Sequence, residues 1–281
     1  MSAQIIDGKA LAAATKLQIK QDVEKLRNCG IAVSLTVILV GDNPASAVYV
    51  RNKETACIET GIISNILRLS ADTTQEEVLS IISKLNEDST VHGILVQLPL
   101  PPQIDAQKVI ERISPLKDVD GFHVQSAGSL LVGKDGFVSC TPRGIIQLIE
   151  STGQSIEGKH AVVVGRSNIV GKPCALLLLQ KNATVTVCHS KTRDMAAIVK
   201  TADIIVAAVG KANVITADMI KPGAIVIDVG MNRVNEKLVG DVDFESVSQV
   251  AGYITPVPGG VGPMTIAMLL KNTVTAGERY A

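Results

Sequence analysis

Short apolar runs alternate with segments of helical periodicity along this chain, and that alternation restricts the possible folds more than any other feature. In the first half, the runs that predict strands lie at residues 35–40, 62–69 and 93–98. The segments with helical periodicity lie at residues 8–28, 44–61 and 74–86. Strands joined through helices need crossover connections, so we predict a mostly parallel sheet with ligands at the carboxyl ends of its strands.

A second unit of the same kind starts near residue 140. A helix to about residue 152 precedes predicted strands at residues 160–164, 184–188, 204–209 and 224–229. The 281 residues suffice for two domains with separate cores. The chain has no Trp, three Phe and three Tyr, so aliphatic side chains must fill the interior, as in parallel sheets covered by helices.

Charge and cysteine usage narrow the class of protein further. The formal net charge is zero and no basic block occurs, which argues against nucleic acid or an anionic membrane as partner. The five Cys and four His are dispersed, which indicates a reducing compartment, no disulfide frame and no metal site. We find no leader pattern and no apolar run of membrane-spanning length, so we expect a cytoplasmic protein.

The helix after the first strand carries three polar side chains on one face. Asn43 is a suitable N-cap and Gly61 a suitable stop. Ser46, Tyr49 and Lys53 are spaced by three and four residues and therefore share a stripe. Two interpretations remain open: Lys53 extends to water as most helical lysines do, or its amine lies poorly hydrated in a ligand cleft and transfers protons near neutral pH.

Two further polar positions lie where ligands of a parallel sheet gather. Gln97 stands near the end of the strand at 93–98, where it either ties down the following loop or faces the same cleft as Lys53. Asp120 lies in the segment 117–122, which by itself predicts a solvated turn. In the alternative interpretation, the Asp120 carboxylate accepts two donors from a flat, amidine-like heterocycle.

A glycine turn follows the strand at 160–164 and opens a helix. This context favours an anion at the helix N-terminus, where free amides and the helix dipole meet it. The spacing of Gly165 and Gly171 fits neither the usual dinucleotide fingerprint nor a magnesium-holding phosphate loop. The segment after the next strand, residues 189–193, holds Ser and basic residues rather than an acidic one, and Arg166 stands in the turn, which predicts NADP as cofactor in a doubly wound domain.

The last loop, residues 255–265, is unusually rich in Pro and Gly. It is either a stiff linker before the final helix or a shaped loop whose glycines let backbone approach a flat ligand. Local sequence does not decide between these two interpretations.

Taken together, the motifs resemble the bifunctional methylenetetrahydrofolate dehydrogenase / methenyltetrahydrofolate cyclohydrolase family. The matching segments are Ser46-Ala-Val-Tyr49-Val-Arg-Asn-Lys53, Gly93-Ile-Leu-Val-Gln97-Leu-Pro-Leu-Pro101, Lys117-Asp-Val-Asp120-Gly121, Cys140-Thr-Pro-Arg-Gly144, Gly165-Arg-Ser-Asn-Ile-Val-Gly171 and Pro256-Val-Pro-Gly-Gly-Val-Gly-Pro-Met-Thr265. The resemblance implies an α/β protein of two domains. Residues 1–139 and 265–281 would form the folate-binding catalytic domain, with the last helix returning to it, and residues 140–264 a Rossmann-like NADP-binding domain.

The resemblance also implies roles for individual residues. The implied catalytic residues are Lys53, Tyr49 and Gln97, with Tyr49 stacking on the folate. The implied folate-contacting positions are Tyr49, Lys53, Val96, Gln97, Leu98, Asp120, Pro258, Gly259, Gly260, Val261 and Gly262. The implied NADP positions are Gly165, Arg166, Ser167, Ser190 and Met231. Ser126 and Ser129 depart from the residues that are usual in the family, Asn and Arg.

The implied activity is NADP-dependent oxidation of 5,10-methylenetetrahydrofolate, followed by hydrolysis of the methenyl product to 10-formyltetrahydrofolate, in a homodimer. A dehydrogenase-only member of the family and a non-catalytic NADP-binding module are the alternatives. Tyr49 and Lys53 also resemble the pair of short-chain dehydrogenases, but here the pair precedes the glycine turn by more than a hundred residues.

Overall fold

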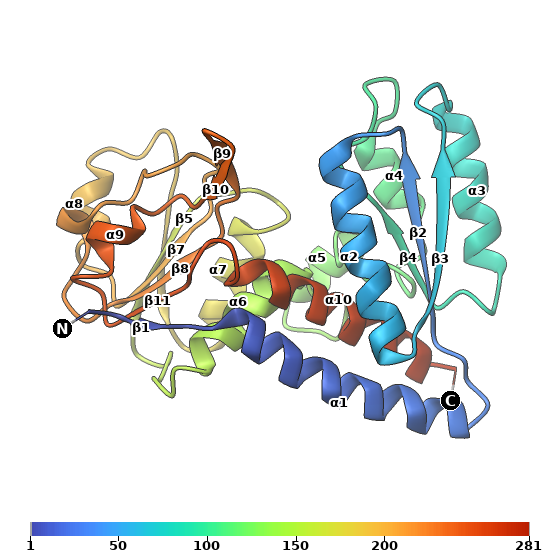
Figure 1. Ribbon diagram of the computed structural model, residues 1–281, viewed down its shortest axis with the longest axis horizontal. Coiled ribbons are helices and arrows are strands. Elements are labelled where there is room, and N and C mark those ends of the chain that lie inside the picture. Colours follow the sequence, from blue (N-terminus) through green and yellow to red (C-terminus); the bar gives the residue numbers. More distant parts are fainter. Residues whose placement is uncertain (1, 281) are drawn as a thin grey trace. The chain divides into compact units, whose positions relative to one another are not determined.

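The computed structural model describes residues 2–280 and contains two compact units, each with its own sheet (Figure 1). The three-stranded unit comprises residues 14–140 and 266–280, and the six-stranded unit comprises residues 2–13 and 141–265. The division falls within two long helices, α1 (Gly8–Asn28) and α10 (Val261–Glu278), and after the first residue of α6 (Cys140–Glu150). Among residues 2–280, none of the helices has both the length and the apolar character needed to cross a membrane.

The three-stranded unit is built on a parallel sheet in the order β3-β2-β4. Its strands are β2 (Ser34–Val40), β3 (Ile63–Leu69) and β4 (Gly93–Val96). Its helices are α1 (Gly8–Asn28), α2 (Pro44–Thr60), α3 (Gln75–Glu87), α4 (Ala106–Arg112), α5 (Val124–Leu131) and α10 (Val261–Glu278). The first residues of α1 and of α10 belong to the six-stranded unit. A core cluster joins β2 and β4 to α3 and α4, while α2 packs on β2 and β3.

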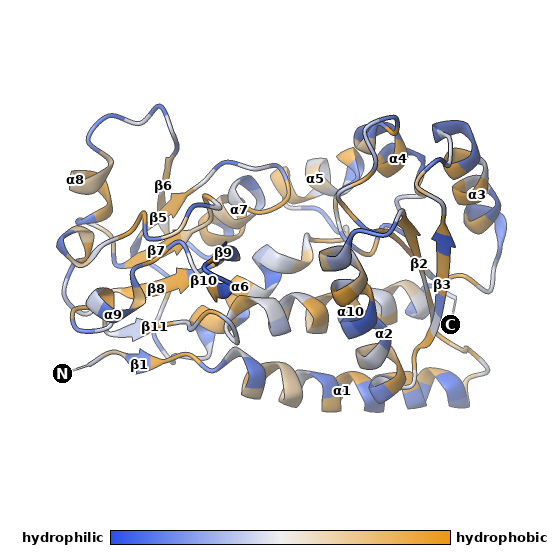
Figure 2. Cartoon of the chain, turned by 45° about the horizontal axis from the view of Figure 1, so that its top comes forward, coloured by the Kyte–Doolittle hydropathy of each residue, from blue (hydrophilic) through white to orange (hydrophobic). Residues whose placement is uncertain are grey.

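The six-stranded unit has a parallel sheet in the order β1-β11-β8-β7-β5-β6. Its strands are β1 (Gln4–Ile5), β5 (His160–Val164), β6 (Thr184–Cys188), β7 (Ile204–Ala207), β8 (Ile225–Asp228) and β11 (Tyr253–Ile254). The remaining elements are α6 (Cys140–Glu150), α7 (Gly171–Gln180), α8 (Met195–Val199), the 3-10 turn η1 (Ala217–Met219), the hairpin β9 (Asn232–Val234) and β10 (Lys237–Val239), and α9 (Phe244–Val247). The strands β5, β7 and β8 are hydrophobic along nearly their whole length (Figure 2), as expected for a sheet buried on both faces.

The order of the strands reverses beside β5. The chain passes from β5 to β6 on one side and then returns to β7 on the other. Such a reversal opens a crevice at the carboxyl ends of the two strands, where doubly wound sheets bind their ligands. The predicted α/β class and the parallel sheets are confirmed.

The compact units differ from the predicted domains at the N-terminus. Residues 2–13 belong with the six-stranded unit because β1 pairs with β11, Gln4 opposite Tyr253 and Ile5 opposite Ile254. Both strands are two residues long, too short to produce a periodic pattern in the sequence.

Candidate active site

The local sequence explains where α2 begins and ends. The Asn43 side chain accepts from the backbone N–H groups of Ala45 and Ser46, at 3.0 and 3.1 Å. Gly61 ends the helix in the left-handed conformation, with φ of 79°. Both predicted caps are therefore confirmed, and they fix which face of α2 meets the sheet.

The three polar residues on this face of α2 differ in their exposure to solvent. Ser46 is buried, Lys53 is partly buried, and Tyr49 leaves 39% of its surface exposed. Burial of the rest of Tyr49 raises the pKa of its phenol. An aromatic ring held in this way is available to stack on a ligand.

Lys53 and Gln97 meet directly inside the three-stranded unit. The Lys53 amine donates to Gln97 Oε1 at 2.9 Å, and Gln97 Nε2 donates to the Leu98 carbonyl at 2.7 Å. The second bond fixes which end of the amide is the acceptor for Lys53. Gln97 therefore both ties down its loop and holds the lysine, so the two interpretations of this residue are compatible.

Alternation along β4 explains the direction of Gln97. Val96 is buried in the cluster beneath α3 and α4, and consecutive strand residues face opposite sides of a sheet. The following residue, Gln97, therefore faces α2. The Val96 side chain lies in the core, so only its backbone is available to a ligand, whereas Leu98 is partly exposed.

The segment that begins at Lys117 is not a solvated turn, and this prediction is wrong. Lys117 is 3% exposed, and its amine donates to the carbonyls of Leu85 and Asp88 at 2.9 and 2.7 Å, at the carboxyl end of α3. Burial lowers the pKa of Lys117, an effect opposed by Asp88. A cation at this end of a helix satisfies carbonyls that have no partner within the helix.

Asp118 anchors the other side of the same segment. Its carboxylate accepts from the N–H groups of Phe122 and His123, at 3.2 and 2.9 Å, and from the Ser126 hydroxyl at 2.8 Å. Burial raises the pKa of Asp118, and these hydrogen bonds oppose the rise. The departure at Ser126 thus has a structural use, because a short hydroxyl fits beside this buried carboxylate.

Ser129, the second departure from the family pattern, fits a similarly narrow space. A Cβ on Gly136 would come within 2.9 Å of the Ser129 Cβ. Both departures therefore lie in the packing of α5 and its following loop.

Asp120 differs from Asp118 in having no hydrogen-bond donor among residues 2–280. Burial raises the pKa of Asp120 to about 6, the Lys53 ammonium lowers it, and the charge of Asp118 raises it. A desolvated carboxylate without donors is satisfied only by a ligand or by water. The structure thus brings Lys53, Gln97 and Asp120 into one neighbourhood of one unit.

The predicted cofactor residues all lie at the carboxyl edge of the six-stranded sheet. Gly165 follows β5, Ser190 follows β6 by two residues, and Met231 follows β8 by three. The Gly165 amide donates to the Cys188 carbonyl at 2.8 Å, so the ends of β5 and β6 adjoin. This edge contains the strand-order reversal, which is where a nucleotide is expected.

The glycine turn leaves no room for a side chain. Gly165 has φ of 132°, and a Cβ there would lie 2.1 Å from the Ala208 carbonyl oxygen. Arg166 and Ser190 are exposed on the loops after β5 and β6. A close backbone turn beside an exposed guanidinium fits a phosphate-bearing nucleotide.

The expectation of free amides at the start of α7 is wrong. The Ser167 hydroxyl accepts from the N–H groups of Val170 and Gly171, at 3.1 and 3.3 Å, and the Ser167 carbonyl accepts from Lys172. Ser167 therefore caps this helix within the chain. The N–H groups of Val170, Gly171 and Lys172 are therefore occupied within the chain.

The glycines of the last loop have different roles. Gly260 packs against the Pro256 carbonyl and the Thr255 side chain, and a Cβ on Gly8 would lie 1.8 Å from the Gly260 carbonyl oxygen. Gly262 instead has open space where a Cβ would stand. Gly260 is therefore required for packing within the unit. Packing within the unit does not require a glycine at Gly262. Sequence reasoning missed the partner glycine, Gly8, because it lies far away in the chain.

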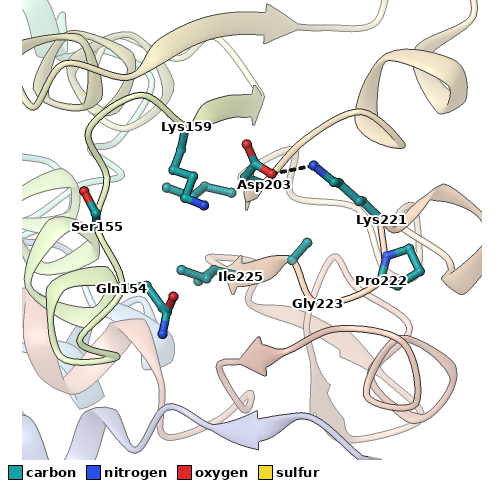
Figure 3. A pocket seen from close by; sticks show the side chains of 10 residues that line it. Gln154, Ser155, Lys159, Asp203, Lys221, Pro222, Gly223 and Ile225 are labelled. Atoms are coloured by element: carbon teal, nitrogen blue, oxygen red, sulfur yellow. Dashed lines mark hydrogen bonds and ion pairs between the residues drawn. The ribbon is translucent and has the colours of Figure 1, made fainter.

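A cavity of about 230 Å³ lies at the opposite edge of the six-stranded sheet (Figure 3). Its lining includes Lys159 and Asp203, which directly precede β5 and β7. Lys221 pairs with Asp203 at 2.6 Å. None of the predicted site residues lines this cavity, and we assign it no role in the reaction.

The fold and these residues define a nucleotide-dependent enzyme of the α/β class, with a lysine–glutamine–aspartate group in one unit and a nucleotide edge in the other. Comparison with known proteins gives the family. The catalytic domain of tetrahydrofolate dehydrogenase/cyclohydrolase matches residues 6–120, and its NAD(P)-binding domain matches residues 139–281. The chain belongs to the tetrahydrofolate dehydrogenase/cyclohydrolase family.

Individual relatives match over the whole chain. The bifunctional protein FolD of Polaromonas naphthalenivorans is 62% identical, covering 99% of this chain and all of that one, and that of Moorella thermoacetica is 60% identical, with the same shares covered. The FolD crystal structure from Campylobacter jejuni superposes with a TM-score of 0.98 at 51% identity, covering both chains fully. The Trypanosoma brucei enzyme, solved with NADP cofactor and an inhibitor, gives 0.96 at 41% identity, covering 100% of this chain and 99% of that one.

Proposed function

We infer that this protein oxidises 5,10-methylenetetrahydrofolate with NADP and then hydrolyses the 5,10-methenyl product to 10-formyltetrahydrofolate. The observation that carries this inference is the hydrogen bond from the Lys53 amine to Gln97 Oε1, with the Asp120 carboxylate in the same neighbourhood. Hydride transfer from the methylene bridge releases no proton, so the oxidation alone needs no such proton-transferring group. Both reactions are typical of the family to which the chain belongs.

In the first reaction, a hydride leaves the methylene bridge of the folate and the bridge becomes a methenyl cation. NADP supplies the hydride acceptor when bound. We assign its binding to the turn Gly165, Arg166 and Ser167, and to Ser190 and Met231. These residues fit it, because the turn is tight, the two loops are exposed, and no carboxylate directly follows β6 to repel a ribose phosphate.

In the second reaction, water attacks the methenyl carbon and loses both of its protons: one is delivered to the ring nitrogen whose bond to that carbon breaks, and the other is released to solvent. We assign the proton transfer to Lys53. In its neutral form, the Lys53 amine can accept a proton from the attacking water and return it to the departing nitrogen. Gln97 holds the amine in position for both transfers.

We assign recognition of the folate ring system to Tyr49 and Asp120. The exposed face of Tyr49 offers a stacking surface. The Asp120 carboxylate, which lacks a donor among residues 2–280, accepts two N–H groups from the amidine-like edge of the pterin. Leu98 and the Val96 backbone complete the folate contacts proposed within this unit. A homodimer in the cytoplasm is also part of the proposal.

The test is Lys53→Met in the purified protein. We expect hydrolysis of methenyltetrahydrofolate to fall by about two orders of magnitude or more, as for loss of a general acid–base group, while NADPH titration gives an unchanged affinity. A variant that hydrolyses at the wild-type rate would refute the assignment. Mixing the wild type with methylenetetrahydrofolate and either NADP or NAD, and following reduced-cofactor absorbance, tests the first reaction and the cofactor preference.

A further inference from the structure

Two buried carboxylates lie at the carboxyl edge of the six-stranded sheet, and the proposed reaction does not use them. Asp228 ends β8 and is 3% exposed, while Asp241 follows β10 and is fully buried. Carboxylates buried to this extent require several donors. Asp228 and Asp241 both have several donors, and these donors come from segments beside the proposed nucleotide edge.

Asp241 accepts four donors from two separate loops. Its Oδ2 accepts from the N–H groups of Val209 and Gly210, at 2.6 and 2.9 Å. Its Oδ1 accepts from the N–H of Lys211 at 3.0 Å and from the Asn232 side-chain amide at 2.9 Å. Three consecutive backbone amides thus surround one internal carboxylate, in the way that such loops usually surround a bound anion.

Asp228 holds Asp241 in its place. Its Oδ1 accepts from the Asp241 N–H at 2.8 Å and from the Gly230 N–H at 2.9 Å, and its Oδ2 accepts from the Val242 N–H at 3.0 Å. The packing is tight, because a Cβ on Gly240 would lie 1.7 Å from Asp228 Oδ2. The two carboxylates therefore form one rigid network.

The loops fixed by this network adjoin the proposed cofactor residues. The loop after β7 starts at Ala208, whose carbonyl abuts Gly165 and whose amide donates to Val164 at 2.7 Å. On the other side, Asn232 directly follows Met231. The hydrogen bonds of Asp241 therefore reach segments on both sides of the proposed nucleotide edge.

We propose that Asp241 is a positioning residue for the nucleotide, whose carboxylate fixes the loop at 208–211 and the segment at 230–232 in the conformation that binds NADP. It acts through these loops and does not touch the reacting atoms. The inference rests on the proposed function, since it assumes that this edge binds NADP. A neutral amide at this position offers one acceptor oxygen and turns its NH₂ group toward backbone donors, so the loops lose their anchor.

The test compares Asp241→Asn with the control Asp243→Asn, two residues away, where, among residues 2–280, the carboxylate accepts only from the Ser246 side chain at 2.6 Å. Two readouts are taken: NADPH affinity by fluorescence titration, and hydrolysis of methenyltetrahydrofolate without nucleotide. We expect D241N to bind NADPH about tenfold more weakly or worse, with hydrolysis within about threefold of wild type, and D243N to match wild type in both. Wild-type NADPH affinity in D241N would overturn the proposal.

A second variant covers the case in which D241N does not fold. Asn232→Ala removes one of the four donors and leaves the three backbone amides on Asp241. We expect it to weaken NADPH binding several-fold with hydrolysis unchanged, and unchanged NADPH binding in N232A would overturn the proposal. A wild-type protein that hydrolyses methenyltetrahydrofolate but does not bind NADPH would refute the proposed cofactor itself, a result distinct from wild-type binding that survives in the variants.

Discussion

Replacing Asp120 with Asn should stabilise the fold at neutral pH while removing a contact to the substrate. Asp120 has no hydrogen-bond donor among residues 2–280, so the amide loses no bond on replacing the carboxylate. Burial is the main reason that the pKa of Asp120 is raised from 3.8 to about 6. The neutral amide of the variant avoids the free-energy cost of removing a charged carboxylate from water. Sites built for binding commonly reduce stability in this way.

The size of the expected stabilisation follows from the shift in the pKa of Asp120. A rise in the pKa of one carboxyl from 3.8 to about 6 corresponds to about 3 kcal/mol of lost stability when the group is ionised. Part of the surface of Asp120 remains exposed to solvent, and screening by this solvent reduces the loss of stability. We therefore expect D120N to exceed the wild type by about 1–2 kcal/mol in free energy of unfolding at pH 7.5.

The pH dependence of the unfolding free energy predicts the same direction for the difference between D120N and the wild type. Well below pH 3.8 the Asp120 carboxyl is protonated in both the folded and the unfolded chain, so it contributes no penalty. As the pH rises from about 4 to about 6, the unfolded chain loses this proton while the folded protein keeps it, so the stability of the wild type falls relative to D120N and levels off above about pH 6. The advantage of D120N should be about half as large at pH 5 as at pH 7.5.

Urea unfolding of the two proteins at several pH values measures this difference. The matched control is Asp118→Asn, since Asp118 is also buried but accepts three hydrogen bonds. D118N should lose about 1–3 kcal/mol, because its NH₂ group faces donors. The reasoning is refuted if D120N is the less stable protein at pH 7.5, or if its difference from wild type does not change with pH.

Three further outcomes follow from the site. The KM for methylenetetrahydrofolate should rise as the pH falls below about 6 in the wild type, since protonation removes the Asp120 acceptor, and should stay flat in D120N; steady-state assays across pH test this. Gln97→Met should lower the hydrolysis rate about tenfold or more, because Lys53 loses its 2.9 Å acceptor, and NADPH titration should be unaffected. Gly165→Ala should weaken NADPH binding strongly, since its Cβ would lie 2.1 Å from the Ala208 oxygen; binding equal to wild type would contradict the assigned turn.

Sequence periodicity predicted the elements that are long enough to show it. The helices α1, α2 and α3, and the strand β5, begin and end within about two residues of prediction. The pairing of β1 with β11 could not be predicted, because two residues carry no period and their partners are far apart in the chain. The close approach of Gly8 to Gly260 is hidden for the same reason.

Local sequence was least informative about the hydrogen-bond partners of polar and charged side chains. Lys117 suggested a solvated turn because its neighbours are turn residues, but its role comes from two carbonyls of α3 that lie about thirty residues earlier. Gln97 was recognised as a buried amide, yet its bond to Lys53 depends on how α2 lies on the sheet. Hydrogen bonds of this kind are set by tertiary packing, which the residue types alone do not encode.

The tripeptide Asp-Val-Asp occurs twice in this chain, at 118–120 and 241–243, and shows how partners decide the role of a carboxylate. In both copies the valine is buried and the first aspartate accepts backbone N–H groups. The second aspartates differ, because Asp243 accepts from a side chain at the start of α9, whereas Asp120 faces Lys53 without a donor. Identical residues thus yield an anchor, a helix-terminal contact and a carboxylate that we propose binds the substrate, according to the donors that the fold places beside each of them.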